Sequence, residues 1–415
     1  ERAEKAIQLM EDVNLPDPHQ IINAYPHELS GGQRQRAMIA MALALGPKIL
    51  IADEPTTALD VTTQAQILDL IKNMQKRLDT GVLFITHDFG VVADIADRVV
   101  VMQEGKIVET GTAKQVLNKP QHPYTKSLIA AIPKLNPRKA RKRSDDIVLK
   151  TDEVSKSFGS GISFFGLGKT GREVKAVREV NVELRKGETL GIVGESGSGK
   201  STFARCIIKL MESDQGQIEL DGVDISKLNR NNMRAYRNRI QMVFQDPFAS
   251  LNPRSRVGDI ISQGPILQGV DKDEAHANTR ELLDIVGLDN KSFDRFPHEF
   301  SGGQRQRIGI ARALALKPDI LVADEPVSAL DVSIQAQILE LLDKIRKQMD
   351  LSMLFITHDL RVAAQVCDQV AVMQYGKVIE VGPTAKLFAN PKHEYTKALL
   401  AAIPGKDWHF SKVNS

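Results

Sequence analysis

Residues 194–201 read Gly-Glu-Ser-Gly-Ser-Gly-Lys-Ser and match the phosphate-binding pattern G-x-x-x-x-G-K-[ST] at every position. An apolar strand pattern at 189–193 precedes this loop and a helical pattern at 203–210 follows it, which is the context that the motif requires. Glycines let backbone N–H groups converge on phosphate oxygens, and the helix N-terminus adds positive potential. The residues expected to bind phosphates are Gly194, Glu195, Ser196, Gly197, Ser198, Gly199, Lys200, Ser201 and Thr202.

Within this loop, Lys200 is expected to neutralise the β- and γ-phosphates, and Ser201 to reach Mg²⁺. Further polar residues follow apolar runs that read as parallel strands, so we expect them at the same sheet edge. Asp324 suits an outer-shell Mg²⁺ ligand, and Glu325 suits a general base that polarises water towards the γ-phosphate. Gln245 could contact metal or water, and His358 could hydrogen-bond the γ-phosphate.

Each of these side chains also has a simpler explanation. An acidic pair at a strand end can be merely solvated, a lone glutamine is usually a surface residue, and a lone histidine is more often a satisfied core residue. The phosphate loop favours the functional interpretation of Asp324 and Glu325. His87 lies at the position of the repeat that matches His358, which favours the functional interpretation of His358.

A second motif occurs twice, 271 positions apart, as Ser30-Gly31-Gly32-Gln33 and Ser301-Gly302-Gly303-Gln304. Serine is a good helix N-cap, which alone could explain it. Two glycines directly after the cap are costly in a helix, however, and make sense if the backbone approaches another molecule. The same spacing relates further pairs, namely Asp53 and Asp324, Glu54 and Glu325, Asp60 and Asp331, and His87 and His358.

This repeat organises the chain into two copies. We expect residues 1–133 to be the C-terminal part of a first domain without a phosphate loop, 134–146 a basic linker, 147–404 a complete second domain and 405–415 a tail. The chain begins with Glu and is expected to start partway through its first domain. The linker is rich in Lys and Arg, and this composition favours a solvated, disordered segment. The alternative is that the linker contacts anionic lipid headgroups.

The amino-acid composition indicates which broad class of protein this chain fits. An apolar fraction of 42% and a charged fraction of 26% are typical of a soluble globular protein, and a net charge of +3 is too small to indicate nucleic acid. Two cysteines in no metal-like spacing fit a reducing cytosol. The longest apolar run, 37–45, is too short to span a bilayer.

Taken together, these motifs and their order resemble the nucleotide-binding domains of ABC transporters. The resemblance implies an α/β fold of the P-loop NTPase type, with a mixed sheet core, a helical signature subdomain and an antiparallel β part, in two tandem copies of which the first is incomplete. The stretch 245–254 and the ends His122-Pro-Tyr-Thr and His393-Glu-Tyr-Thr resemble the oligopeptide, dipeptide and nickel importer branch, in its fused form similar to microcin-C-type peptide importer ATPases.

The resemblance also implies an activity, cofactors and partners. ATP and Mg²⁺ would lie between one domain's phosphate loop and the other's signature, with Ser30–Gln33, Ser301–Gln304, Asp60 and Asp331 among the binding residues and Phe158 stacking on adenine. Hydrolysis would power an importer of peptides or related solutes, with two membrane permeases and an extracytoplasmic binding protein, at the cytoplasmic face of the bacterial inner membrane. We expect no nucleic acid among the partners, and we expect contact with the membrane only through partner proteins.

Two alternatives remain open at this stage. A soluble ABC ATPase that acts on ribosomes or DNA usually carries a long charged helical insert or a coiled coil, whereas the linker here is short and heptads are missing. A regulatory module without hydrolysis is disfavoured by Glu325. The transported substrate depends on partners outside this sequence.

Overall fold

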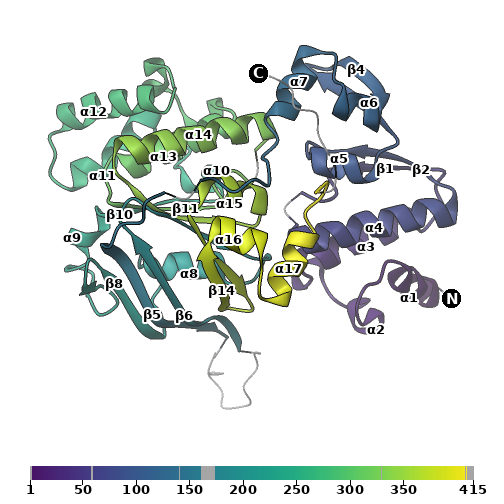
Figure 1. The fold of residues 1–415 in the computed structure, drawn as a ribbon, viewed down its shortest axis with the longest axis horizontal. Coiled ribbons are helices and arrows are strands. Elements are labelled where there is room, and N and C mark those ends of the chain that lie inside the picture. Colours follow the sequence, from purple (N-terminus) through teal and green to yellow (C-terminus); the bar gives the residue numbers. More distant parts are fainter. Residues whose placement is uncertain are drawn as a thin grey trace. The chain divides into compact units, whose positions relative to one another are not determined.

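The computed structural model describes residues 2–57, 59–139, 141–159, 173–328, 330–406 and 408 (Figure 1). Their contacts form two compact units. The first comprises Glu1–Ile132, Asp331–Ser333 and Ala398–Ser415, and the second comprises Pro133–Leu330 and Ile334–Lys397. Residues 398–406 and Trp408 therefore pack with the first unit, where the indole N–H of Trp408 donates to the side chain of Asn118 at 2.9 Å.

A six-stranded mixed sheet forms the core of the second unit. Its strand order is β10 (Ile240–Val243), β11 (Ile320–Asp324), β12 (Ser352–Thr357), β7 (Thr189–Val193), β13 (Gln369–Gln374) and β14 (Lys377–Pro383). The first five strands pair in parallel, and β14 returns antiparallel after a tight turn at Tyr375 and Gly376. All residues of β7, β11 and β12 are buried, which explains their continuous apolar runs.

A four-stranded antiparallel sheet packs on the same core, in the order β6 (Val174–Arg185), β5 (Ile147–Phe158), β8 (Gln215–Leu220) and β9 (Val223–Asp224). The fully buried Phe203 of α8 (Lys200–Ile207) belongs to the apolar cluster that joins the two sheets. The mixed sheet, the antiparallel sheet and the helices confirm the predicted fold class.

Helices make up the rest of the second unit. Figure 1 shows α11, α12 and α13 gathered on one side of this unit and β5, β6 and β8 on another. The helices are α9 (Arg234–Arg237), α10 (Pro247–Ser250), α11 (Val257–Leu267), α12 (Lys272–Ile285), α13 (Gly302–Leu314), α14 (Val332–Gln348), α15 (Leu360–Val366) and α16 (Thr384–Ala389), with 3₁₀ turns η2 (Asn290–Asp294) and η3 (Pro297–Glu299). The last helix, α17 (Glu394–Ala401), belongs to this unit up to Lys397.

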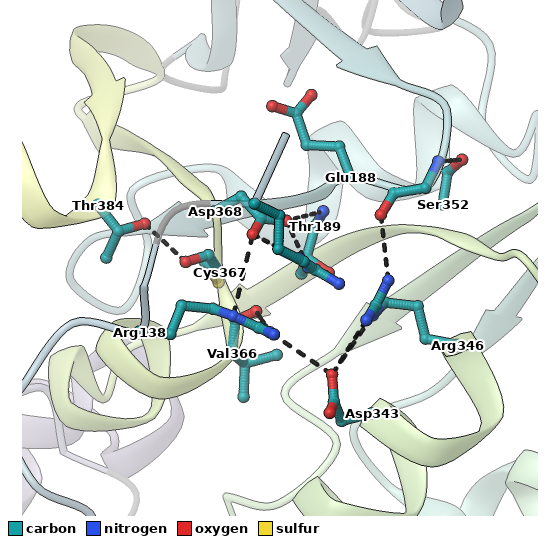
Figure 2. A network of polar contacts seen from close by, with 12 residues as sticks. Arg138, Glu188, Thr189, Asp343, Arg346, Ser352, Val366, Cys367, Asp368 and Thr384 are labelled. Atoms are coloured by element: carbon teal, nitrogen blue, oxygen red, sulfur yellow. Dashed lines mark hydrogen bonds and ion pairs between the residues drawn. The ribbon is translucent and has the colours of Figure 1, made fainter. Parts of the chain in front are cut away.

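The basic linker is docked onto the second unit, which corrects the expectation of a solvated, disordered segment. The guanidinium of Arg138 donates to the carbonyl of Val366 at 3.0 Å and pairs with Asp343 at 3.5 Å (Figure 2). Arg141 donates through Nε to Asp368 at 2.7 Å and through Nη2 to the Thr189 hydroxyl at 3.1 Å.

The docking site is the amino-terminal edge of the central sheet. Arg141 also contacts the second carboxylate oxygen of Asp368, and Arg143 bonds Glu188 at 3.0 Å. Glu188 directly precedes β7, and Asp368 directly precedes β13. Since parallel strands share one polarity, the linker lies at the edge opposite the phosphate loop that follows β7.

The described part of the first unit contains counterparts of some of these elements, at nearly the same lengths. They are α1 (Arg2–Asp12), α2 (Pro18–Ile21), η1 (Pro26–Glu28), α3 (Gly31–Leu43), β1 (Ile49–Asp53), α4 (Val61–Leu78), β2 (Gly81–Ile85), α5 (Phe89–Ile95), β3 (Arg98–Gln103), β4 (Lys106–Thr112), α6 (Ala113–Asn118) and α7 (Pro123–Ala130). β1 and β2 form a parallel pair, and β3 and β4 form an antiparallel pair.

One face of these strands is uncovered. Ile49 and Leu83 are 67% and 55% exposed, whereas their equivalents in the second unit, Ile320 and Leu354, are 0% exposed. The second-unit residues pack in the cluster that contains Phe203 of α8. The described part of the first copy has fewer strands than the second copy, which agrees with the exposure of this face.

Candidate functional site

The phosphate loop connects β7 to α8, as the sequence predicts. Gly194 and Gly199 adopt φ of +152° and +103°. A Cβ at Gly194 would lie 2.2 Å from the carbonyl oxygen of Met373, and one at Gly199 would lie 2.1 Å from that of Ala176. Only glycine fits at these two positions, so the loop's tight turn is set by its packing on β13 and β6.

Side chains inside the loop suit a polyphosphate. The ammonium of Lys200, only 4% exposed, donates to the carbonyls of Gly194 at 2.7 Å and Glu195 at 2.8 Å. The buried hydroxyl of Ser198 has no hydrogen-bond partner among the described residues. A buried cation and an orphaned hydroxyl beside loop amides are the groups that a phosphate would satisfy.

The strand ends bring the predicted polar residues together with the loop. The hydroxyl of Ser201 donates to Oδ1 of Asp324 at 2.9 Å. Burial, and then the neighbouring charge of Glu325, raise the pKa of Asp324 above its usual value. A hydroxyl and a buried carboxylate in contact are oxygen donors of the kind that Mg²⁺ prefers.

Glu325 is held from two sides. The amide of Gln245 donates to Oε2 at 2.7 Å, and Nδ1 of His358 lies 3.1 Å from Oε1. Burial raises the pKa of Glu325, but the hydrogen bond and charge of His358, with the charge of Lys200, outweigh it and lower the pKa. For His358, burial lowers the pKa, and the bond to Glu325 outweighs this and raises it.

The backbone of Glu325 is itself unusual. Its φ is +45°, a left-handed conformation that is sparsely populated for side chains other than glycine and asparagine. The Glu325 amide donates to the carbonyl of Ile356 at the end of β12, at 2.9 Å. This bond aims the side chain across the sheet edge towards Gln245 and His358.

The first copy repeats this geometry without a phosphate loop among its described residues. Glu54 has φ of +47°, its amide bonds Ile85, and its carboxylate lies 2.7 Å from Nδ1 of His87. Asp53 ends β1, and Asp60 caps α4 by accepting from the amide of Thr63 at 2.9 Å. The equivalent Asp331 is exposed at the start of α14.

Both signature motifs form capping boxes. The Ser30 hydroxyl accepts from the Gln33 amide while the Gln33 side chain accepts from the Ser30 amide, and Ser301 and Gln304 do the same. Packing within the fold explains the second glycine of each motif. A Cβ at Gly32 would lie 2.5 Å from the side chain of Thr63, and a Cβ at Gly303 would lie 2.4 Å from that of Ile334. At Gly31 and Gly302 a Cβ would have only ordinary contacts, at 3.6 Å.

The remaining predicted residues are exposed or half-buried. Ser196 and Gly197 are exposed, and Thr202 is half-buried in the first turn of α8. Phe158 ends β5, 42% exposed, with Nζ of Lys156 6.0 Å from its ring centroid. The glycine-rich insertion that follows, 159–171, falls almost wholly outside the described residues.

One residue at the loop was not predicted. The hydroxyl of Tyr395, at the start of α17, accepts from the backbone amide of Glu195 at 3.1 Å. In the sequence, Tyr395 is visible only as part of His393-Glu-Tyr-Thr, the motif that repeats at His122. No spacing rule connects such a motif to a loop 200 residues earlier.

The fold and this sheet edge define an ATP-binding cassette, and the chain belongs to the ABC transporter family, whose profile matches residues 1–57 and 177–328. A second profile, the oligopeptide/dipeptide transporter C-terminal region, matches 108–160 and 379–412. The chain is an ABC-type ATPase coupled to transport.

Two curated relatives show the similarity over almost the whole chain. The glutathione import ATP-binding protein GsiA of Escherichia coli is 48% identical over an alignment of 425 positions, which covers 96% of this chain and 68% of the relative. The peptidoglycan transport ATP-binding protein YejF of Agrobacterium fabrum is 49% identical over 404 residues, covering 97% of this chain and 73% of the relative.

A solved structure supports the fold independently. The dimeric post-hydrolysis state of an ATP-binding cassette with ADP and phosphate bound is 28% identical, with a TM-score of 0.51 over 57% of this chain and 98% of that chain. Within the described part of the chain, no helix combines the length and the hydrophobicity needed to cross a membrane.

Proposed function

We propose that this chain binds MgATP at Gly194–Ser201 and hydrolyses it to power the uptake of peptides or chemically related small solutes. The observation that carries the site assignment is the cluster at one sheet edge, where Lys200 lies in the loop, Ser201 contacts Asp324, and Glu325 is held between Gln245 and His358. These residues cover every role that phosphoryl transfer to water requires.

Each residue has a defined part in the reaction. The ammonium of Lys200 neutralises charge on the β- and γ-phosphates, and Ser201 and Asp324 would hold Mg²⁺, which would supply further positive charge against the phosphates. Glu325, ionised because its pKa is lowered, accepts a proton from water as the water oxygen attacks the γ-phosphorus and the bond to ADP breaks. Gln245 and His358 orient that carboxylate.

ATP is expected to lie between a phosphate loop and a signature motif from another domain. The signature serine and its first glycine, Ser301-Gly302 or Ser30-Gly31, start a helix of 13 residues whose N-terminus suits phosphate. Asp60 and Asp331, at the starts of the next helices, would lie near this surface.

Uptake of peptide-class solutes is supported by the C-terminal profile and by the relatives' names. Peptidoglycan fragments and glutathione, named for those relatives, both contain peptide bonds, which defines the solute class. The importer relatives support permease subunits as partners, and we expect two of them, with a binding protein outside. The chain would act at the cytoplasmic face of the bacterial inner membrane.

A Glu325→Gln substitution tests the catalytic assignment. Loss of a general base typically slows a reaction by about 10²- to 10⁴-fold. We expect that loss in steady-state ATP hydrolysis by the full chain, with MgATP binding retained in equilibrium dialysis. Lys200→Ala is expected to weaken binding as well, because the loop loses its cation.

The internal repeat provides a matched control. Glu54 has the same backbone conformation and the same histidine contact as Glu325, but no phosphate loop lies among the described residues of its copy. Glu54→Gln is therefore expected to hydrolyse ATP at the wild-type rate. Wild-type turnover in Glu325→Gln would show that this carboxylate is not the base.

A further inference from the structure

The peptide group between Gly194 and Glu195 is held at both of its polar ends. Its carbonyl oxygen, on Gly194, accepts from the ammonium of Lys200 at 2.7 Å. Its N–H, on Glu195, donates to the hydroxyl of Tyr395 at 3.1 Å. In a trans peptide the carbonyl and the N–H point in opposite directions, so Lys200 and Tyr395 fix one plane from opposite sides.

Tyr395 is itself firmly placed. The backbone amides of Lys392 and His393 donate to the two carboxylate oxygens of Glu380 at 2.9 and 3.1 Å. The amide of Tyr395 donates to Nδ1 of His393 at 3.1 Å. Glu380 belongs to β14, which pairs with β13, and β13 pairs with β7, the strand that leads into the phosphate loop.

We propose that Tyr395 is a positioning residue for nucleotide binding, which acts through the 194–195 peptide on Lys200. If the hydroxyl is removed, this peptide can rotate, and the carbonyl that directs the ammonium loses its fixed orientation. Tyr395 lies in the C-terminal region matched by the oligopeptide/dipeptide profile. That region therefore takes part in the nucleotide site and is not only an appended structural segment.

The expected consequence concerns affinity more than turnover. A hydrogen bond between neutral groups is worth about 0.5–1.5 kcal/mol, which corresponds to a change of roughly 2- to 12-fold in an equilibrium constant. Lys200 binds phosphates in the ground state, while the contacts that orient Glu325 come from Gln245 and His358. Tyr395→Phe should thus raise the Kd and KM for ATP several-fold, with kcat at saturating ATP within about twofold of wild type.

The test is equilibrium binding of MgATP together with steady-state ATPase measurements on the full chain. Tyr124→Phe is the matched control, because Tyr124 sits in the equivalent motif, where Glu109 accepts from the amides of Gln121 and His122, and His122 accepts from the Tyr124 amide. It should leave Kd, KM and kcat unchanged. Melting temperatures of both variants separate local effects from loss of folding.

Three results would overturn the inference: an unchanged Kd in Tyr395→Phe, a fall in kcat with unchanged KM, or an equal rise of Kd in Tyr124→Phe. The inference rests on the proposed phosphate role of Lys200. The Lys200→Ala variant distinguishes a failure of the proposed site from a failure of the role proposed for Tyr395. If Lys200→Ala binds MgATP like wild type, the proposed site is wrong. If Lys200→Ala loses affinity while Tyr395→Phe does not, only the role of Tyr395 is wrong.

Discussion

Two adjacent carboxylates, Asp324 and Glu325, have pKa values shifted in opposite directions. Asp324 ends a fully buried strand, where burial and the charge of Glu325 both disfavour its ionised form. Glu325 is also buried, yet His358 and Lys200 favour its ionised form. A raised pKa at the first position suits a carboxyl that awaits a cation, and a lowered pKa at the second suits a base.

The contact between His358 and Glu325 should stabilise the fold in a limited pH range. The pKa of His358 is raised from 6.5, so its contribution is fully present below about 6.5 and is lost as pH rises through the folded-state pKa. The pKa of Glu325 is lowered from 4.5, so its contribution is present above about 4.5 and is lost as pH falls through the folded-state pKa. The window common to both is about 4.5–6.5.

His358→Gln should therefore destabilise the protein more at about pH 5.5 than at about pH 9, by roughly 1.5–3 kcal/mol at the lower pH, the range of a charged hydrogen bond. Urea unfolding at the two pH values measures the difference. In a Glu325→Gln background the same substitution should show no such pH dependence. A cost that is equal at both pH values in the wild-type background would exclude a charged pair.

At the scale of elements, the segment after Gln245 connects the catalytic edge to the signature helix. Asp246 caps the short helix α10. On α13, the guanidinium of Arg305 lies 4.9 Å from the ring centroid of Phe248, and that of Arg312 donates to the carbonyl of Ser250 at 2.5 Å. This segment thus links Gln245 by direct contacts to α13, which begins at the signature motif.

The linker is a second element whose contacts have a measurable cost. The carboxylate of Asp368 is 11% exposed and receives two bonds from Arg141 and one from the amide of Thr189. Arg141→Ala leaves a largely buried charge under-paired, which should reduce the free energy of unfolding by about 1–3 kcal/mol. The midpoint of denaturant-induced unfolding of the second unit reports this change.

Lys142 is the control, since it is the next linker residue and is exposed. Lys142→Ala should leave the midpoint within error of wild type, because exposed charges contribute little. Equal midpoints for Arg141→Ala and Lys142→Ala would mean that the docked linker does not stabilise the second unit.

For the whole molecule, the internal repeat allows the same residue to be tested in two environments. Leu354 on β12 is 0% exposed, and Leu83 on β2 is 55% exposed. Leu354→Ala removes a buried side chain and should cost about 2–5 kcal/mol, whereas Leu83→Ala should cost within about 0.5 kcal/mol. Denaturant unfolding of the two variants of the 415-residue chain gives both values.

Similar costs for both substitutions would show that the apolar face of β1 and β2 is covered in solution. A small cost for Leu354→Ala would instead contradict the packing of the central sheet on α8. The comparison is informative because both residues are leucines at equivalent positions of paired parallel strands.

The sequence by itself determined the features that depend on short stretches of chain. The phosphate loop needs glycines within eight consecutive residues, and its flanking strand and helix are readable from local periodicity. The repeat aligns Glu54 with Glu325 and His87 with His358. Because parallel strands end at a common edge, the gathering of Asp324, Glu325, Gln245 and His358 could be predicted from strand ends alone.

Only the tertiary structure decided which of these groups touch and what else joins them. Gln245 and Glu325 meet across 80 residues, and Tyr395 meets the loop across 200, because the strand order places β10 beside β11, β13 beside β7 and β14 beside β13. The linker's charge pattern favoured solvation, yet Asp343, Asp368 and Glu188 supply carboxylates from distant elements. Contacts between segments far apart in the chain depend on strand order and packing, which local sequence patterns do not encode.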